Sequence, residues 1–137
     1  MEKMYKVYTS YFSNKLFKKK KHDCIKIPVC ATLQNYSLYP SNRWYRELAP
    51  DVEILNRYNR IGNKTKSIKN WFTREYYRKL DSMKESGDLL GYVKELQNLC
   101  KYNDVFLLCY EKPNEFCHRH LLAEYLNKFY ELDVSEY

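Results

Sequence analysis

The alternation of apolar and polar positions along the chain predicts short strands separated by helices. Residues Met4 to Ser10 alternate and are rich in aromatic and β-branched side chains, which predicts the first strand. Cys24 to Ala31 form the second predicted strand, in which Pro28 indicates a strand end or an edge position. The apolar run from Val105 to Cys109 predicts a buried third strand, and Leu132 to Ser135 a short last one.

Between the second and third strands, apolar residues recur with helical spacing. A short helical piece is expected from Trp44 to Leu48, then a helix with a broad apolar face that starts at Pro50-Asp51 and ends at Gly62-Asn63, a long helix capped by Ser67 that reaches Leu80 or Glu85, and a helix from Leu89 to Cys100. The last helix is expected from Glu115 to about Tyr130.

Strands separated by helices indicate a parallel sheet with right-handed crossovers. The expected fold is therefore α/β, a small Rossmann-like three-layer sandwich with helices on both faces of a mostly parallel sheet of three to five strands. No internal repeat or linker divides the chain, so residues 1–137 are expected to form a single domain.

Composition narrows the class of protein. The chain is 45% hydrophobic and 17% aromatic, which is typical of a globular protein, and it has no apolar run near the ~18 residues that span a bilayer. With no signal peptide in view, we expect a cytoplasmic protein without a membrane partner. Five cysteines without a Cys-x-x-Cys pair indicate free thiols rather than a disulfide framework or a structural zinc site. No cofactor and no oligomeric state are indicated.

The net charge of +7 is unevenly distributed. Residues 1–80 hold 18 Lys and Arg against 6 Asp and Glu, whereas residues 81–137 hold 6 against 11. The basic half, which includes the run Lys18 to Lys21, is a candidate surface for phosphates or nucleic acid. A solvated basic face without a specific partner is the alternative.

Chemically active side chains concentrate where the third strand meets the last helix. Loops at the carboxyl ends of strands in open α/β sheets bind ligands. With Asn114 as N-cap, Cys117 would lie in the first helical turn, where the helix N-terminus and Arg119 or a histidine would stabilise its thiolate. Arg119 can bind a phosphate or carboxylate through two parallel hydrogen bonds, and Glu111 can orient His118 or Arg119 or act as a base.

Each of these residues also has a structural interpretation. Cys109 and Cys117 can be packed as small hydrophobic residues, and Arg119 can pair with Glu111 to brace the loop. A metal site formed by Cys109, Cys117 and His118 matches no standard spacing, so no metal is predicted. Phosphate-loop, dinucleotide-binding and Cys-x5-Arg signatures are absent from the sequence.

Two segments together resemble the signature of the uncharacterised DUF488 family, whose members pair a Leu-Leu-Cys-x-Glu strand end with a Cys-His-Arg helix start. They are Leu107-Leu108-Cys109-Tyr110-Glu111-Lys112-Pro113 and Phe116-Cys117-His118-Arg119-His120-Leu121. The segments Tyr39-Pro40-Ser41 and Leu48-Ala49-Pro50 are compatible with the first half of the family. The resemblance implies a compact α/β fold with a pocket at Cys109, Glu111, Cys117, His118 and Arg119, and Tyr39 and Ser41 are further candidate ligand-binding residues.

Two functions remain open. The first is an enzyme that acts on a nucleotide or a nucleic-acid component, with Cys117 as nucleophile or acid/base, His118 and Glu111 assisting, and Arg119 binding the anion. The second is a non-catalytic binder of a nucleotide or nucleic acid that uses the same residues for recognition. A purely structural motif is the third interpretation.

Overall fold

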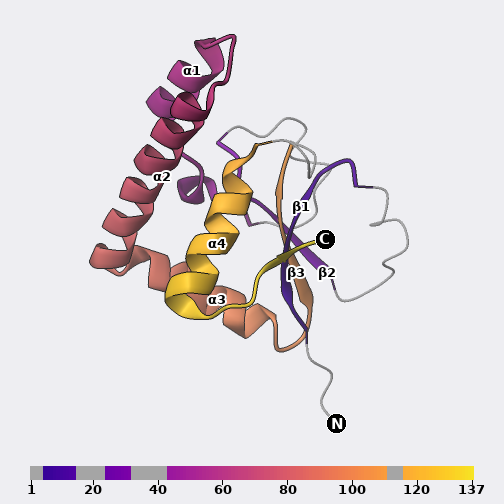
Figure 1. Ribbon diagram of the computed structural model, residues 1–137. Helices are drawn as coiled ribbons and strands as arrows, with labels where there is room; N and C mark the ends of the chain where they lie inside the picture. Colours follow the sequence, from indigo (N-terminus) through magenta and orange to yellow (C-terminus); the bar gives the residue numbers. More distant parts are fainter. Residues whose placement is uncertain (1–4, 15–23, 32–42, 111–115) are drawn as a thin grey trace.

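The computed structural model describes residues 5–14, 24–31, 43–110 and 116–137. Within them, four strands form one sheet in the order β2-β3-β1-β4, and every pair is parallel (Figure 1). The strands are β1 (Val7–Tyr11), β2 (Cys24–Pro28), β3 (Asp104–Cys109) and β4 (Ser135–Glu136). The predicted α/β class and parallel sheet are confirmed.

Strand β3 lies inside the sheet between β1 and β2, as its apolar sequence predicts, and Val105 to Cys109 are all buried. Strand β1 continues one residue past the predicted end, because Tyr11 still pairs with Cys109. Strand β2 is an edge strand and ends at Pro28, in agreement with the edge position that this proline indicates.

The helices are the 3-10 helix η3 (Arg46–Leu48), α1 (Val52–Arg60), α2 (Lys66–Ser86), α3 (Asp88–Leu99) and α4 (His118–Tyr130). The predicted cap of α2 at Ser67 is wrong, because the side chain of Thr65 accepts the hydrogen bond from the amide of Ile68, at 3.3 Å. Helix α2 ends at Ser86, and the residue that caps it is Gly87, whose left-handed φ of 88° suits glycine. Among the described helices, none is long and apolar enough to cross a membrane.

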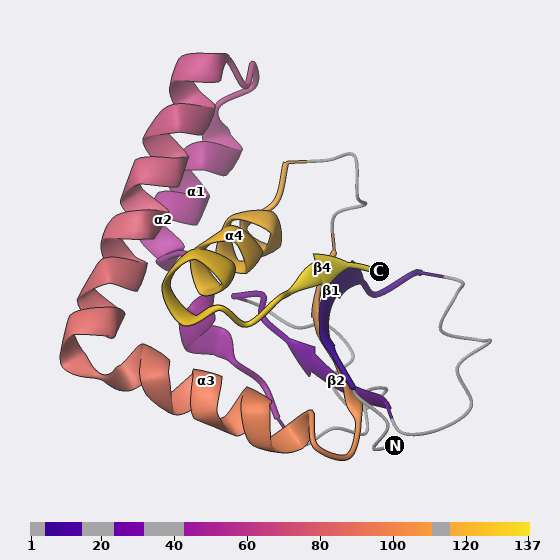
Figure 2. The same ribbon diagram turned by 60° about the horizontal axis from the view of Figure 1, so that its bottom comes forward.

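The helices that the structure describes lie on one side of the sheet, where their apolar residues form the core with alternate residues of the strands (Figure 2). The opposite face carries the stacked rings of Tyr8 and Phe106, with Tyr137 packed edge-on against both. The described residues thus supply the sheet and one helical layer of the predicted sandwich.

Helices α1 and α2 form a hairpin that extends past the sheet (Figure 1). No residue of α1 is fully buried, and the predicted apolar face of this helix packs against α2, with the rings of Tyr58 and Phe72 4.7 Å apart. The hairpin therefore displays most of its surface to solvent.

Candidate functional site

Three thiols meet at the carboxyl edge of the sheet. Tyr11 pairs with Cys109 at the ends of β1 and β3, while Pro28 pairs with Leu108 at the end of β2. The chain beyond each strand therefore starts at the same edge, and Cys30, Cys109 and Cys117 form a buried cluster there with Phe12 beside it. Cys30 is a member of the cluster that sequence reasoning missed, because it follows β2 in a stretch without any motif.

Helix α4 starts at His118, so the predicted start at Glu115 and the predicted N-cap Asn114 are wrong. The N-cap is Cys117, which has an extended backbone. The ring of Phe116 packs against Tyr58 and Phe72 at centroid distances of 5.9 and 5.6 Å, and this contact accompanies the extended backbone just before the helix. Cys117 consequently lies at the N-terminal boundary of α4, as its N-cap, rather than within the first helical turn.

The imidazole of His118 faces the thiol of Cys117. Its Nδ1 is 3.9 Å from Cys117 Sγ, and its Nε2 is 2.8 Å from the carbonyl oxygen of Val29. Because a carbonyl only accepts hydrogen bonds, Nε2 is the protonated nitrogen and Nδ1 in the neutral ring presents a lone pair to the thiol. A thiol, a base and a group that orients the base are the parts of an activated cysteine.

Tyr76 holds the other side of the imidazole, with its ring edge-on to His118 at a centroid distance of 5.7 Å. Burial, followed by the nearby thiols of Cys117 and Cys109, raises the pKa of Tyr76 well above its ordinary value. The hydroxyl therefore stays protonated and donates to the carbonyl of Leu48. Tyr76 positions the ring and takes no proton from it.

Arg119 is completely buried and joins the thiols to the C-terminal strand. Its Nη1 donates to Cys109 Sγ at 3.1 Å, while Nε and Nη2 donate to the two carboxylate oxygens of Glu136 at 3.2 and 2.9 Å. Burial opposes the charge of the guanidinium, but the hydrogen bonds that it donates to Glu136 and its contact with Cys109 outweigh burial and raise the pKa of Arg119. Arg119 thus carries a fixed positive charge beside Cys109.

Glu136 was not found by sequence reasoning. The hydroxyl of Thr9 donates to it at 2.7 Å, so the carboxylate links β1, α4 and β4. It lies 17 residues from Arg119, and no local spacing signals the pair. Among the described residues, Glu136 is the carboxylate that pairs with Arg119; Glu111, the partner expected from sequence, lies outside them.

The structure therefore brings together four of the predicted site residues, namely Cys109, Cys117, His118 and Arg119. Glu111, Tyr39 and Ser41 lie outside the described residues, as does the run Lys18 to Lys21. Each described member is at most 7% exposed. The site is a buried cluster of thiols, an imidazole and a guanidinium.

The same cluster has three atoms that can ligate a metal, the two sulfurs of Cys109 and Cys117 and a nitrogen of His118, all within 4.8 Å of one another. Soft sulfur and imidazole donors suit zinc or copper. The guanidinium of Arg119 at 3.1 Å from Cys109 Sγ opposes a cation at this position. We therefore interpret the cluster as a thiol site.

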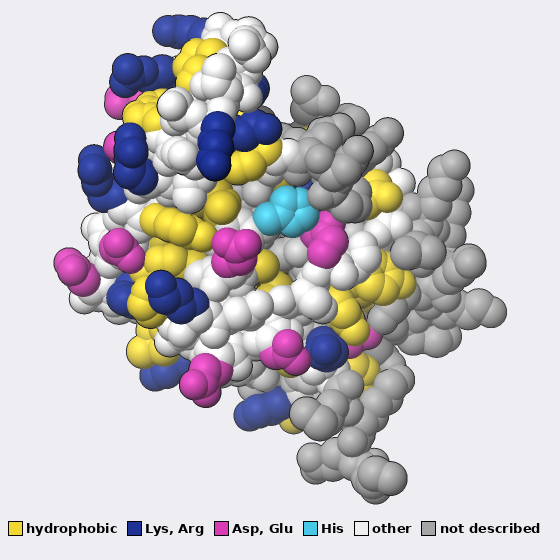
Figure 3. Space-filling model, in the orientation of Figure 1, with side chains coloured by type: hydrophobic (Ala, Val, Ile, Leu, Met, Phe, Trp, Pro, Cys, Tyr) yellow, Lys and Arg dark blue, Asp and Glu magenta, His cyan; other side chains and the backbone are white. Residues whose placement is uncertain are grey.

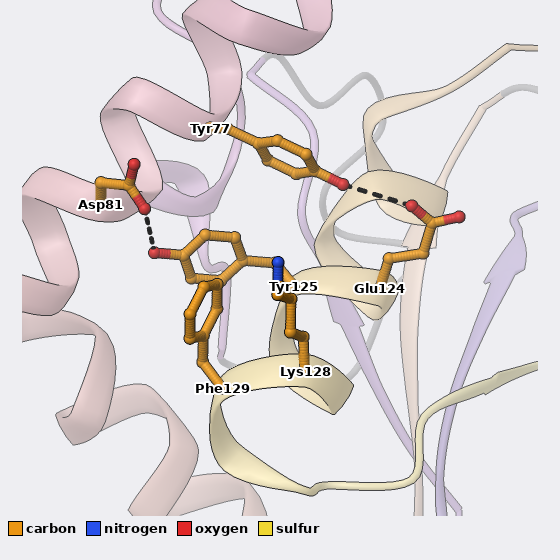
Figure 4. Close-up of a pocket in the computed structure, with 6 residues that line it drawn as sticks. All are labelled: Tyr77, Asp81, Glu124, Tyr125, Lys128 and Phe129. Carbon is orange, nitrogen blue, oxygen red and sulfur yellow. Dashed lines mark hydrogen bonds between the residues drawn. The ribbon is translucent and has the colours of Figure 1, made fainter.

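A cavity of about 370 Å³ lies between α2 and the C-terminal half of α4 (Figure 4). Its tyrosine hydroxyls already donate to its carboxylates, Tyr77 to Glu124 at 3.2 Å and Tyr125 to Asp81 at 2.5 Å. The thiols lie at the other end of α4. The tyrosine hydroxyls and carboxylates of the cavity thus bind one another, and the cavity lies away from the thiol cluster.

A small parallel α/β fold with a Cys-His-Arg sequence at the start of its last helix defines the class of protein. The chain matches a family model described as the "Active DUF488-N3 subclade" over residues 14–129. It belongs to the DUF488 family. No match was found among curated proteins or among solved structures.

Proposed function

We propose that this protein is a thiol-dependent enzyme in which Cys117 is the nucleophile and His118 is its base. The observation that carries the proposal is the pair of contacts made by the imidazole, to Cys117 Sγ through Nδ1 and to the carbonyl of Val29 through Nε2. The description of the family as an active subclade agrees with an enzyme.

The chemical step starts with a proton transfer inside the pair. The S–H bond of Cys117 breaks, its proton moves to Nδ1 of His118, and the sulfur lone pair attacks an electrophilic atom of the substrate. The bond between that atom and its leaving group breaks, and the imidazolium returns the proton to the leaving group. Water then attacks the covalent intermediate, which releases the product and restores the thiol. Both side chains are buried, and burial disfavours an isolated charge. The thiolate and the imidazolium that the transfer creates therefore stay next to each other as a pair of opposite charges. The N-terminus of α4 favours the negative charge on sulfur.

Arg119 and Cys109 complete the site in this proposal. The guanidinium is held by Glu136, so it is a rigid positive charge beside the sulfurs rather than a mobile clamp. Such a fixed charge favours an anion that forms during the reaction. We propose a substrate of the nucleotide or nucleic-acid class, which the basic composition of residues 1–80 supports.

Thiol reactivity tests the proposal. The chain is alkylated with iodoacetamide between pH 5.5 and 9.5, and mass spectrometry of its peptides follows each cysteine separately. An activated Cys117 reacts well below pH 8.5, the pKa of an ordinary thiol. Rates in the urea-unfolded chain serve as the reference, so that burial and activation are separated.

Cys100 is the internal control. Burial, with a smaller contribution from Asp104, raises the pKa of its thiol to about 11. Its thiol stays protonated throughout this pH range, so its rate rises only towards the alkaline end. If Cys117 reacts as slowly as Cys100 at pH 7, the enzyme proposal is wrong. A non-catalytic binder also predicts that Cys117→Ser retains full affinity for ligand.

A further inference from the structure

The tip of the α1–α2 hairpin is strongly basic. Residues 54–74, which we call the basic hairpin, hold six cations and not one carboxylate: Arg57, Arg60, Lys64, Lys66, Lys69 and Arg74. Figure 3 shows dark blue side chains gathered over α1 and the adjoining part of α2. The flanking residues Glu53 and Glu75 are acidic, but six cations within 21 residues still leave this stretch with a clear excess of positive charge.

The fold displays these charges rather than pairing them. Helix α1 buries no residue and contacts α2, so the outer side of the hairpin faces solvent. In the part of the chain that the structure describes, none of the six cations forms a salt bridge with a carboxylate. Elsewhere, exposed cations such as Arg43 and Arg78 do have such partners.

Some of the cations are held over aromatic rings. Arg57 lies 5.0 Å from the ring centroid of Trp71, and Lys64 lies 4.7 Å from that of Tyr58. These contacts fix the long side chains in place, and they also cover the ring faces that a base would otherwise stack on. The surface therefore offers positive charge in a set arrangement rather than a stacking platform.

We infer that the basic hairpin binds the sugar-phosphate backbone of a nucleic acid, without reading its sequence. Closely spaced cations without carboxylates match the regular negative charge of a polynucleotide. A membrane-bound helix instead needs an outward apolar face, and here the rings of Tyr58, Phe72 and Phe116 pack against one another.

The basic hairpin is continuous with the thiol site. Phe116 packs against the hairpin and directly precedes Cys117, and Lys69 lies 5.8 Å from the ring centroid of Phe116. A nucleic-acid strand bound to the basic hairpin would therefore pass beside the N-terminus of α4. This second step rests on the proposed function, whereas binding by the hairpin does not.

Fluorescence anisotropy with labelled single-stranded and duplex oligonucleotides tests the binding. The variant Arg60→Gln/Lys66→Gln/Arg74→Gln removes three exposed cations of the hairpin. We expect at least a tenfold loss of affinity, and a salt slope for single strands that falls by about 2, since each phosphate contact contributes roughly 0.7.

The matched control is Lys94→Gln/Lys101→Gln/Lys128→Gln, which removes three exposed cations elsewhere and changes the net charge equally. It should bind like the wild type. An equal loss in both variants would mean general attraction by net charge and would overturn the inference. Tighter binding to anionic lipid vesicles or to poly-glutamate than to oligonucleotides, lost with the hairpin cations, would assign the surface to a membrane or an acidic protein instead.

The link to the thiol site has its own measurement. A saturating oligonucleotide should slow the alkylation of Cys117. It should not change the alkylation of Cys24, which lies at the amino end of β2, the end opposite the thiol cluster. Equal alkylation rates of Cys117 with and without oligonucleotide would show that a nucleic acid bound to the basic hairpin does not reach the thiol site. If Cys117 proves inert, the proposed function fails, while anisotropy still decides whether the hairpin binds.

Discussion

At the scale of single residues, Arg119 ties the thiol cluster to the C-terminal strand. Its three donor nitrogens reach Cys109 on β3 and Glu136 on β4, and the side chain has no exposed surface. The guanidinium and the carboxylate form an ion pair through two hydrogen bonds. Removing one of the two side chains destabilises the protein, because the charge of the other then lacks its counter-charge.

We therefore predict that Arg119→Ala lowers the free energy of unfolding substantially. The loss should fall somewhat below the roughly 3–5 kcal/mol typical of breaking a fully buried pair, because Glu136 keeps 26% of its side chain exposed to water. Urea denaturation of Arg119→Ala, Arg119→Lys and wild type measures it. Lysine should rescue little, since one ammonium cannot make both contacts.

The double variant Arg119→Ala/Glu136→Gln identifies the partner. Removing the carboxylate charge should recover part of the lost stability, because Glu136 no longer lacks its counter-charge. If Glu136→Gln brings no recovery, the stability effect of Arg119 does not come from this ion pair.

At the scale of secondary-structure elements, local signals place the helices but not their ends. Apolar spacing located both bounds of α3 to within one residue, whereas the predicted end of α2, at Leu80 or Glu85, falls six residues or one residue before the observed end at Ser86. The starts of α2 and α4 were predicted wrongly, because several residues able to cap lie near each start and tertiary contacts choose among them. For α4, the packing of Phe116 against the α1–α2 hairpin goes with the later start, and the sequence around residue 116 gives no sign of it.

The cap of α2 gives a paired prediction. Thr65→Ala should destabilise the protein by about 1 kcal/mol, because it removes the acceptor for the amide of Ile68. Ser67→Ala, two residues further on inside the helix, should change stability by less than about 0.5 kcal/mol. Equal effects of both substitutions in urea denaturation would contradict the observed cap.

At the scale of the whole molecule, the sequence predicts the class of fold and half of the site. Helix–strand alternation indicated a parallel sheet, and the apolar strand at 105–109 is indeed interior. The motif at 107–121 located Cys109, Cys117, His118 and Arg119. Contacts between distant segments were not predictable, because they depend on the order of the strands in the sheet. These contacts are the hydrogen bond of His118 to the carbonyl of Val29, the packing of Cys30 against the other two thiols, and the ion pair of Arg119 with Glu136.

The charge of the molecule is also arranged by the fold. The excess of cations in residues 1–80 was evident from the sequence, yet the position of six of these 18 cations on one projecting hairpin depends on the packing of α1 against α2. The hairpin then meets the thiol site through Phe116. The basic hairpin therefore lies beside the buried thiol cluster, and this arrangement links the two proposals.

The central claim is that His118 activates Cys117, and the most direct measurement compares alkylation of Cys117 in the wild type and in His118→Gln. Glutamine can keep the hydrogen bond to the carbonyl of Val29 but supplies no base. We predict that the rate at pH 7 falls at least about tenfold, in line with the usual contribution of a general base, while the rate at Cys100 stays unchanged. A Cys117 rate and pH profile identical in both proteins would contradict the account.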